Sequence, residues 1–344
     1  MSQRITLKQV AAQAGVSYQT VSKVLNGQVR VSKQTEQRIW EAARLFDYHP
    51  NQLARSLRSQ RSHLIGYSWV PAAPGEDNPI LDQFMQSMAL AAENAGYQLL
   101  AFPHRPGTLW TEGYRTLIET NRVDGFVLSS VEYNDARIVL LQEQGFPFVA
   151  FGRSNPGWEF PSVDIDGAAG MRSIVEHLLS LGHRRIAALA WPESSRVGQN
   201  RIEGYFSGLE YAGITPAPEW ILRGEGIYLF GLESTSRFLE GPADQRPTAI
   251  IGFNDVMAIG AIHAVQQKGY HVGTDVAITG FDDLPMSQYL TPPLTSVSQP
   301  TWEVGQRVIE LLVKILNGGP LIQAHVLLSP QIIIRQSTNP IVMG

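Results

Sequence analysis

The residues with the clearest chemical potential lie in the segment 5–27, ITLKQVAAQAGVSYQTVSKVLNG. Tyr18, Gln19 and Lys23 fall in the first turns of an expected helix, and Gln19 and Lys23 are four positions apart, on one face. In the major groove of DNA, Gln pairs bidentately with adenine and Lys donates to guanine acceptors. Two hydroxyl side chains of the same helix can reach phosphates, Thr20 and Ser22. The pattern favours a base-reading helix; the alternative is a solvated helix in an ordinary α-hairpin.

Three short helices are expected in the first 48 residues to position these side chains. Thr6 is a suitable N-cap for the first helix, and Gly15 can adopt φ > 0 and end it. Ser17 can cap the second helix and Ser32 the third. Apolar residues at helical spacing are available for packing, namely Leu7, Val10, Ala11, Val21, Val24, Leu25, Ile39, Ala42, Ala43 and Leu45. Helix, glycine turn, helix and supporting helix is the order of a helix-turn-helix domain, residues 1–48.

A linker is expected at residues 49–62. Pro50 disfavours the helical conformation at the preceding residue, and Asn51 can cap a helix that begins just after it. Residues 51–59, NQLARSLRS, can form a helix, but nine residues are too few for a stable isolated helix in water. The segment is therefore expected to be a hinge helix that folds only when something packs against it.

The rest of the chain, 63–344, alternates short β-like runs with helical stretches. A first series runs from LIGYSWV at residue 64 to FPFVAF at 146–151, and a second begins near residue 163. Such alternation predicts parallel sheets covered by helices, so the fold class is α/β with two similar subdomains. A helix at 301–316 and an apolar strand at 331–335 follow the second series.

Composition narrows the function classes. The chain has 344 residues, 44% apolar and 17% charged, which is enough for a sizeable core. The formal charge of −4 is unevenly distributed: residues 1–62 hold ten Lys or Arg and three Asp or Glu (+7), and the remainder holds 17 and 28 (−11). A basic head on an acidic body indicates that only the head meets a polyanion.

Several alternatives lack their expected signals. With no cysteine, disulfides, thiolate nucleophiles and CxxC zinc sites are excluded. No apolar run reaches membrane-span length, and the N-terminus MSQRITLKQV lacks the apolar stretch of a signal peptide, so a cytoplasmic protein without membrane contact is expected. We find no GxSxG, P-loop, HExxH, GxGxxG after a strand or metal-ligand spacing of histidines. Neither an enzyme nor a cofactor or metal is expected.

The ordered motifs resemble the lactose/galactose repressor (LacI) family. In the head these are VSYQTVSKVLNG, VSKQT and HPNQLARSLRS. In the body they are NP at 78–79, RVDGFVL at 122–128, GHRRIA at 182–187, RIEG at 201–204, ND at 254–255, GFDD at 280–283 and PPLTSVSQP at 292–300. Together they cover almost the whole chain. The resemblance implies a homodimeric, allosteric transcription regulator, a repressor, that binds a pseudo-palindromic operator and responds to a small carbohydrate effector.

Site residues follow from this resemblance. The implied DNA contacts are Thr6, Ser17, Tyr18, Gln19, Thr20, Ser22, Lys23, Asn26, Asn51, Ala54, Arg55, Leu57 and Arg58. Leu57 matches the leucine that wedges into the minor groove and kinks the DNA, in agreement with the physics of apolar wedges. Lys23 stands where several members carry arginine, which alters the base preference because lysine lacks the planar fork.

The core resembles periplasmic sugar-binding proteins, with a ligand cleft between an N-subdomain, about 63–162 plus 296–328, and a C-subdomain, about 163–293 plus 329–344. The resemblance implies effector contacts at Arg201, Asn254 and Asp282, and Arg153 and Gln299 are also expected to line the cleft. Aromatic residues near expected strand ends can stack on the apolar faces of a sugar, although most aromatics in such positions belong to the core; they are Trp69, Phe151, Trp191 and Tyr228. Phe151-Gly152-Arg153 replaces the Asp-Arg common in the family.

Purely structural roles remain open for the three polar residues among the expected contacts. Asn254 can simply cap a helix, Asp282 can shape a turn, and Arg201 can lie on a helix surface.

Two rival functions have signatures of their own. A sugar-binding protein of the periplasmic type without DNA function would have a signal peptide and no basic head. A nucleotide-dependent α/β enzyme with an accessory DNA domain would carry glycine loops that cradle phosphates. The sequence matches neither expectation.

Overall fold

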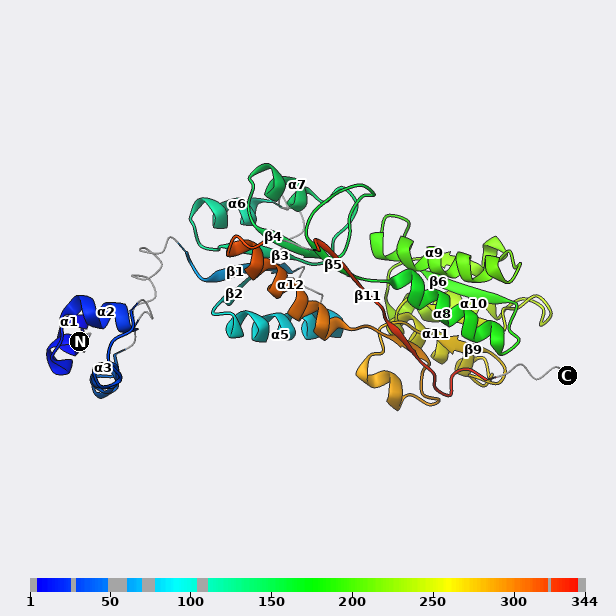
Figure 1. Cartoon of the computed structure of the whole chain (residues 1–344). Coiled ribbons are helices and arrows are strands. Elements are labelled where there is room, and N and C mark those ends of the chain that lie inside the picture. The colour runs from blue at the N-terminus through cyan, green and yellow to red at the C-terminus, as the bar shows by residue number, and fades with distance from the viewer. Residues whose placement is uncertain are drawn as a thin grey trace. The chain divides into compact units, whose positions relative to one another are not determined.

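The computed structural model of the chain describes residues 5–25, 29–48, 61–69, 78–103, 111–320 and 323–339. The chain divides into two compact units, Met1–Ser62 and His63–Gly344. The first is a small helical head, and the second is an α/β core of two lobes (Figure 1). In the described ranges, no helix has the length and apolar character needed to cross a membrane.

The head contains three helices, α1 (Leu7–Ala14), α2 (Tyr18–Leu25) and α3 (Lys33–Leu45). Their boundaries follow from caps at the predicted residues. Thr6 and Gln9 form a capping box at the start of α1, and Gly15 ends it at φ 65°. Ser17 Oγ accepts from Thr20 N at 3.1 Å, and Ser32 Oγ accepts from Thr35 N at 3.3 Å. These expected caps are confirmed.

One apolar cluster holds the three helices together. Val10, Val21 and Ile39 are fully buried, one from each helix. Leu45, expected to pack there, is instead 68% exposed at the end of α3, so that expectation was wrong. The apolar core of the head is small. The helix caps therefore matter for the stability of the head, because each cap stabilises a helix by about 1 kcal/mol.

The first lobe of the core is a six-stranded parallel sheet in the order β11-β5-β4-β3-β1-β2. Its strands are β1 (Leu64–Trp69), β2 (Gln98–Pro103), β3 (Gly125–Leu128), β4 (Phe148–Phe151), β5 (Ser162–Ile165) and β11 (His325–Leu328). Helices α5 (Pro79–Asn94) and α12 (Thr301–Leu316) pack on one face. Helices α6 (Glu112–Glu119) and α7 (Ala136–Glu143) pack on the other. Alternate residues of β3 serve the two faces: Val127 packs with α5 and α12, and Phe126 with α6 and α7.

The second lobe has a four-stranded parallel sheet in the order β7-β6-β8-β9. Its strands are β6 (Ile186–Ala190), β7 (Ile221–Arg223), β8 (Ala249–Gly252) and β9 (Ala277–Thr279). Helices α8 (Gly167–Ser180), α9 (Arg196–Tyr211), α10 (Tyr228–Phe238) and α11 (Asp255–Gln267) surround it, with short 3-10 turns at Pro218–Trp220 and Pro285–Tyr289. An antiparallel pair, β10 (Ser296–Ser298) with β12 (Gln331–Ile333), lies beside α8.

The predicted α/β alternation is confirmed, but two expected subdomain boundaries need correction. The boundary near 163 runs through β5, which pairs with β4 and β11 in the first sheet. β10 was assigned to the N-subdomain from residue 296, yet Thr279 bridges Thr295 and Asp282 bridges Ser298, which places it beside the second sheet. The chain therefore passes between the lobes three times: after β5, after β10 and after β11.

Candidate DNA-reading surface and ligand cavity

Helix α2 presents the expected base-reading side chains to solvent. Tyr18 is 45% exposed, and Gln19 and Lys23 are exposed on the same helix. Thr6 and Ser17 are exposed at the two helix starts that they cap. Ser22 differs, because it is only 7% exposed within the head and cannot be counted among the outward-facing groups.

The other expected DNA contacts cannot be placed. They lie outside the described residues and stay predictions: Asn26, Asn51, Ala54, Arg55, Leu57 and Arg58.

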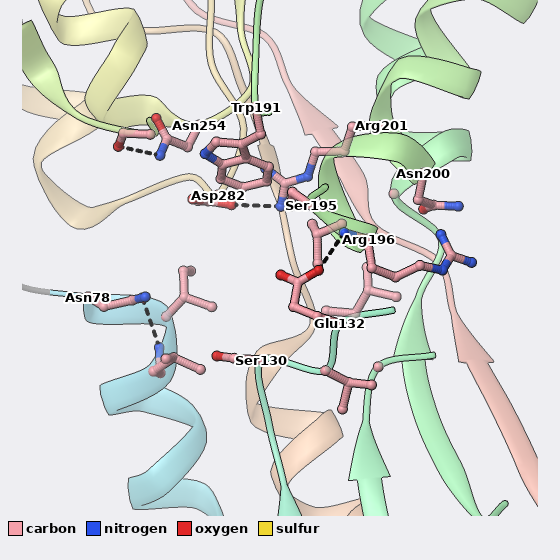
Figure 2. A pocket seen from close by; sticks show the side chains of 18 of the residues that line it. Asn78, Ser130, Glu132, Trp191, Ser195, Arg196, Asn200, Arg201, Asn254 and Asp282 are labelled. Atoms are coloured by element: carbon pink, nitrogen blue, oxygen red, sulfur yellow. Dashed lines mark hydrogen bonds and ion pairs between the residues drawn. The ribbon is translucent and has the colours of Figure 1, made fainter. Parts of the chain in front are cut away.

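The core contains a cavity of about 760 Å³ whose walls come from both lobes (Figure 2). The residues that line it cluster after the carboxyl ends of β3, β4, β6, β8 and β9 and at the starts of α5 and α9. This is where open α/β sheets place ligands. Seven of the nine expected effector residues line the cavity. They are Phe151, Arg153, Trp191, Arg201, Asn254, Asp282 and Gln299.

Arg201 is the most enclosed charge of the cavity. The residue is 4% exposed, and its guanidinium carbon lies 4.8 Å from the ring centroid of Trp191 and 3.7 Å from that of Phe281. Its Nη2 is 3.2 Å from Asp282 Oδ1, and its Nη1 donates to the carbonyl of Phe253. Burial lowers the pKa of Arg201, and the charge of Asp282 opposes this. The alternative of a surface role for Arg201 was wrong.

Asp282 is fixed by its neighbours and by the backbone. Gln299 Nε2 donates to Asp282 Oδ1 at 2.7 Å, and the residue has φ 115°, a strained conformation for a non-glycine. Burial raises the pKa of Asp282, while Arg201 and Gln299 lower it. Its neighbour Asp283 pairs with Arg335 at 2.7 Å, so the two adjacent carboxylates serve different purposes.

Asn254 caps a helix, as the structural alternative proposes, and it also lines the cavity. Its Oδ1 accepts from Met257 N at 2.8 Å and caps α11, and its Nδ2 donates to the Gly226 carbonyl at 2.9 Å. Nδ2 keeps a second N–H and Oδ1 a second lone pair, so a ligand can contact Asn254 without breaking either bond.

The first-lobe wall carries a second ion pair. Arg153 Nε is 2.5 Å from Asp164 Oδ2, and burial raises the pKa of Asp164 against the opposing charge of Arg153. Phe151 packs on Phe84 with ring centroids 4.9 Å apart. Glu132 also lines this wall, and it was missed because a lone carboxylate after a strand has no distinguishing spacing.

Two expected effector residues lie elsewhere. Trp69, at the end of β1, is 38% exposed and is not among the residues that line the cavity. The Tyr228 hydroxyl is 2.8 Å from His263 Nδ1 on α11, so its ring packs between helices rather than lining the cavity. Both are aromatic residues near an expected strand end or loop, and this pattern does not specify the direction in which the side chain points. Among the described residues, no group of three or more His, Asp or Glu is placed to hold a metal ion.

Comparisons with known proteins agree with this architecture. A model of the bacterial regulatory proteins of the lacI family matches residues 6–51, and a periplasmic binding protein-like domain matches 175–338. The repressor CytR of Escherichia coli K12 is 30% identical over 334 residues, which cover 97% of this chain and 96% of CytR. The chain belongs to the LacI family. It is an HTH-type DNA-binding transcriptional regulator, as the resemblance implied.

Solved structures of LacI-family proteins share the fold. A regulatory protein of Chloroflexus aggregans is 52% identical, with a TM-score of 0.78 over 80% of this chain and 99% of that one. The lac repressor dimer bound to operator and an anti-inducer has a TM-score of 0.85 at 28% identity, over 98% of this chain and all of that one. The CelR–cellobiose complex has a TM-score of 0.74 at 30% identity, over 97% of this chain and all of that one.

Proposed function

We propose that the protein is a homodimeric repressor whose affinity for operator DNA is controlled by a neutral carbohydrate bound in the core cavity. Its relatives are transcriptional regulators, and we infer that it acts by binding, without catalysis, in the cytoplasm where the DNA is. Tyr18, Gln19 and Lys23 read bases, and phosphate contacts supply much of the affinity.

The observation that carries the choice of ligand is the pairing of charges around the cavity. Arg201 pairs with Asp282, and Arg153 pairs with Asp164. A neutral polyhydroxylated molecule can use these four side chains as donors and acceptors without unpairing their charges, whereas a charged ligand bound at either pair would compete with the charge already there. The ring of Trp191 adds an apolar surface of the kind that sugar rings stack on. The solved structure of CelR is a complex with cellobiose, which supports the same ligand class.

A thermal-shift screen with neutral sugars, cellobiose included, tests the ligand. A binding sugar at 100 times its Kd stabilises the core by about 2.7 kcal/mol. Arg201→Ala and Asp282→Ala should each abolish this shift while operator binding persists. Variants that respond like wild type would place the effector elsewhere.

A gel shift with genomic fragments tests the DNA function. Lys23→Gln should weaken binding to the selected fragment, because it removes an exposed cation on α2. Lys268→Gln, the same change on the core, is the matched control. Equal loss in both variants, or no shifted fragment at all, would contradict the proposal.

A further inference from the structure

The two lobes touch beside the cavity through Glu132 and Arg196. Glu132 follows β3 in the first lobe, and Arg196 is the first residue of α9 in the second. The backbone N of Arg196 donates to Glu132 Oε2 at 2.6 Å (Figure 2). Arg196 Nε donates to the Ser154 carbonyl of the first lobe at 3.0 Å, and its guanidinium carbon lies 5.5 Å from the ring centroid of Tyr133.

The acceptor is itself held in place. Ser154 Oγ donates to the backbone carbonyl of Glu132 at 2.7 Å. The two first-lobe residues that accept hydrogen bonds from Arg196 are therefore hydrogen-bonded to each other. The side chain of Arg137 donates to the carbonyls of Ser129 and Ser130, which fixes the loop that leads to Glu132. The carboxylate is therefore presented to α9 by a braced loop.

The bond lies where a negative charge interacts favourably with a helix. The first backbone N–H groups of a helix have no partner within it, and the helix dipole attracts an anion there. Ser195 Oγ accepts from Gly198 N at 3.1 Å and satisfies one of these donors of α9. Glu132 satisfies the one at Arg196, across the lobe boundary.

We propose that Glu132 is a positioning residue that latches the start of α9 to the first lobe and thereby sets the distance between the two walls of the cavity. Arg201 lies on the same helix, little more than one turn further along, so the latch also fixes where Arg201 stands relative to the first-lobe wall. The consequence for effector binding rests on the proposed function; the latch itself does not.

The latch strength depends on the ionisation of Glu132. Burial raises the pKa of this carboxyl, and Asp135 raises it further, while the bond from Arg196 N and the charges of Arg137 and Arg196 lower it. The ionised form attracts the start of α9 more strongly than the neutral form does. Acidification through this raised pKa should therefore loosen the latch at a pH above that at which an exposed glutamate is protonated.

The absence of native cysteine allows a direct test on the full chain. Spin labels at Glu119→Cys on α6 and Glu210→Cys on α9, both exposed, report the distance between the lobes by electron–electron double resonance. Labelled chains are diluted with unlabelled ones so that only distances within one chain contribute. At pH 8 the wild type should give a short, narrow distribution, which lengthens by more than about 2 Å when the pH is lowered far enough to protonate Glu132.

Three variants decide the outcome. Glu132→Ala should give the longer distribution at both pH values. Glu132→Gln, which imitates the protonated acid, should give at both pH values the distribution that the wild type reaches only at low pH. Glu143→Ala removes an exposed carboxylate of α7 in the same lobe and should behave as wild type.

The proposal is overturned if Glu132→Gln keeps the wild-type pH dependence, or if Glu132→Ala leaves the pH 8 distribution unchanged. Circular dichroism checks folding, and Glu132→Gln alone decides the matter if the alanine variant unfolds. No DNA or sugar enters the measurement, so its failure and that of the proposed function are separate results.

Discussion

Asp255 is fully buried at the first position of α11, where it joins three parts of the second lobe. It accepts hydrogen bonds from Ser287 Oγ at 2.5 Å, Ser296 Oγ at 2.5 Å and Leu284 N at 2.7 Å. The bonds connect α11 to the region of the 3-10 turn Pro285–Tyr289 and to β10, after which the chain crosses to the first lobe. Burial, reinforced by the nearby Asp282, raises the pKa of Asp255 to about 7.

This shift predicts how stability changes with pH. Between the ordinary pKa and about 7, the folded state holds a proton on Asp255 that the unfolded state has lost, so this group's contribution to the free energy of unfolding falls as the pH rises. The slope is roughly 1.4 kcal/mol per pH unit. Urea denaturation at pH 5 and pH 7 should show the wild type losing stability relative to Asp255→Asn, which cannot ionise. A constant difference between the two proteins would contradict the shift.

At the scale of elements, α8 and α9 approach closely enough to require glycine. A Cβ built on Gly204 of α9 would lie 2.2 Å from the Ala168 carbonyl oxygen on α8. The close approach brings α9, with Arg201, against the start of α8, where Asn200 Oδ1 accepts from Ala168 N at 3.0 Å. Packing of the two helices therefore supports the second-lobe wall of the cavity.

Gly204→Ala should push the two helices apart and cost about 1–3 kcal/mol of stability by overpacking. Gly241→Ala is the matched control, because nothing lies within 4 Å of the place that its Cβ would take and its φ is not in the left-handed region. Thermal unfolding of both variants measures the difference. Equal midpoints would mean that the helices accommodate the methyl group.

The helices and strands also show which parts of the fold can be predicted from sequence patterns. Helix α12 begins and ends at the predicted residues 301 and 316, because its apolar residues repeat at helical spacing over four turns. The short strands β10 and β11 were not predicted. β5 was grouped with the wrong sheet, because chain order does not reveal which strands are neighbours in space.

The candidate site was predictable to a similar degree. Polar residues with recognisable motifs, Arg201 and Asp282, were placed in the cavity, and they lie there as an ion pair. Tyr228 was misplaced, because an aromatic residue at a helix start gives no indication of the side it faces. Glu132 and Arg196 were missed, because their partnership depends on two loops that meet only after folding.

At the scale of the whole molecule, DNA binding and effector binding depend on charge in different ways. Residues 1–62 carry a formal charge of +7 and the rest of the chain carries −11. In the cavity, the opposite charges within each of the two ion pairs neutralise each other. DNA affinity should therefore depend steeply on ionic strength, and effector affinity only weakly.

A salt titration of both affinities checks this separation. With six to ten phosphate contacts from a dimer, raising salt from about 50 to about 200 mM should weaken operator binding by roughly 10³–10⁵-fold. Binding of the sugar identified by the thermal-shift screen, measured calorimetrically in the same buffers, should change little. Parallel salt dependence of the two affinities would show that charge is not partitioned in this way.

The pairing of β5 with β11 has a consequence for synthesis on the ribosome. Ser162 pairs in register with His325, so the edge of the first sheet at β5 stays open until translation has passed β11, long after β5 itself has been made. A nascent chain that stalls after β9 but before β11 would present β5 as a bare edge, the kind of template on which aggregates grow. Translation of β11, rather than of the first five strands, is thus the event that completes this sheet.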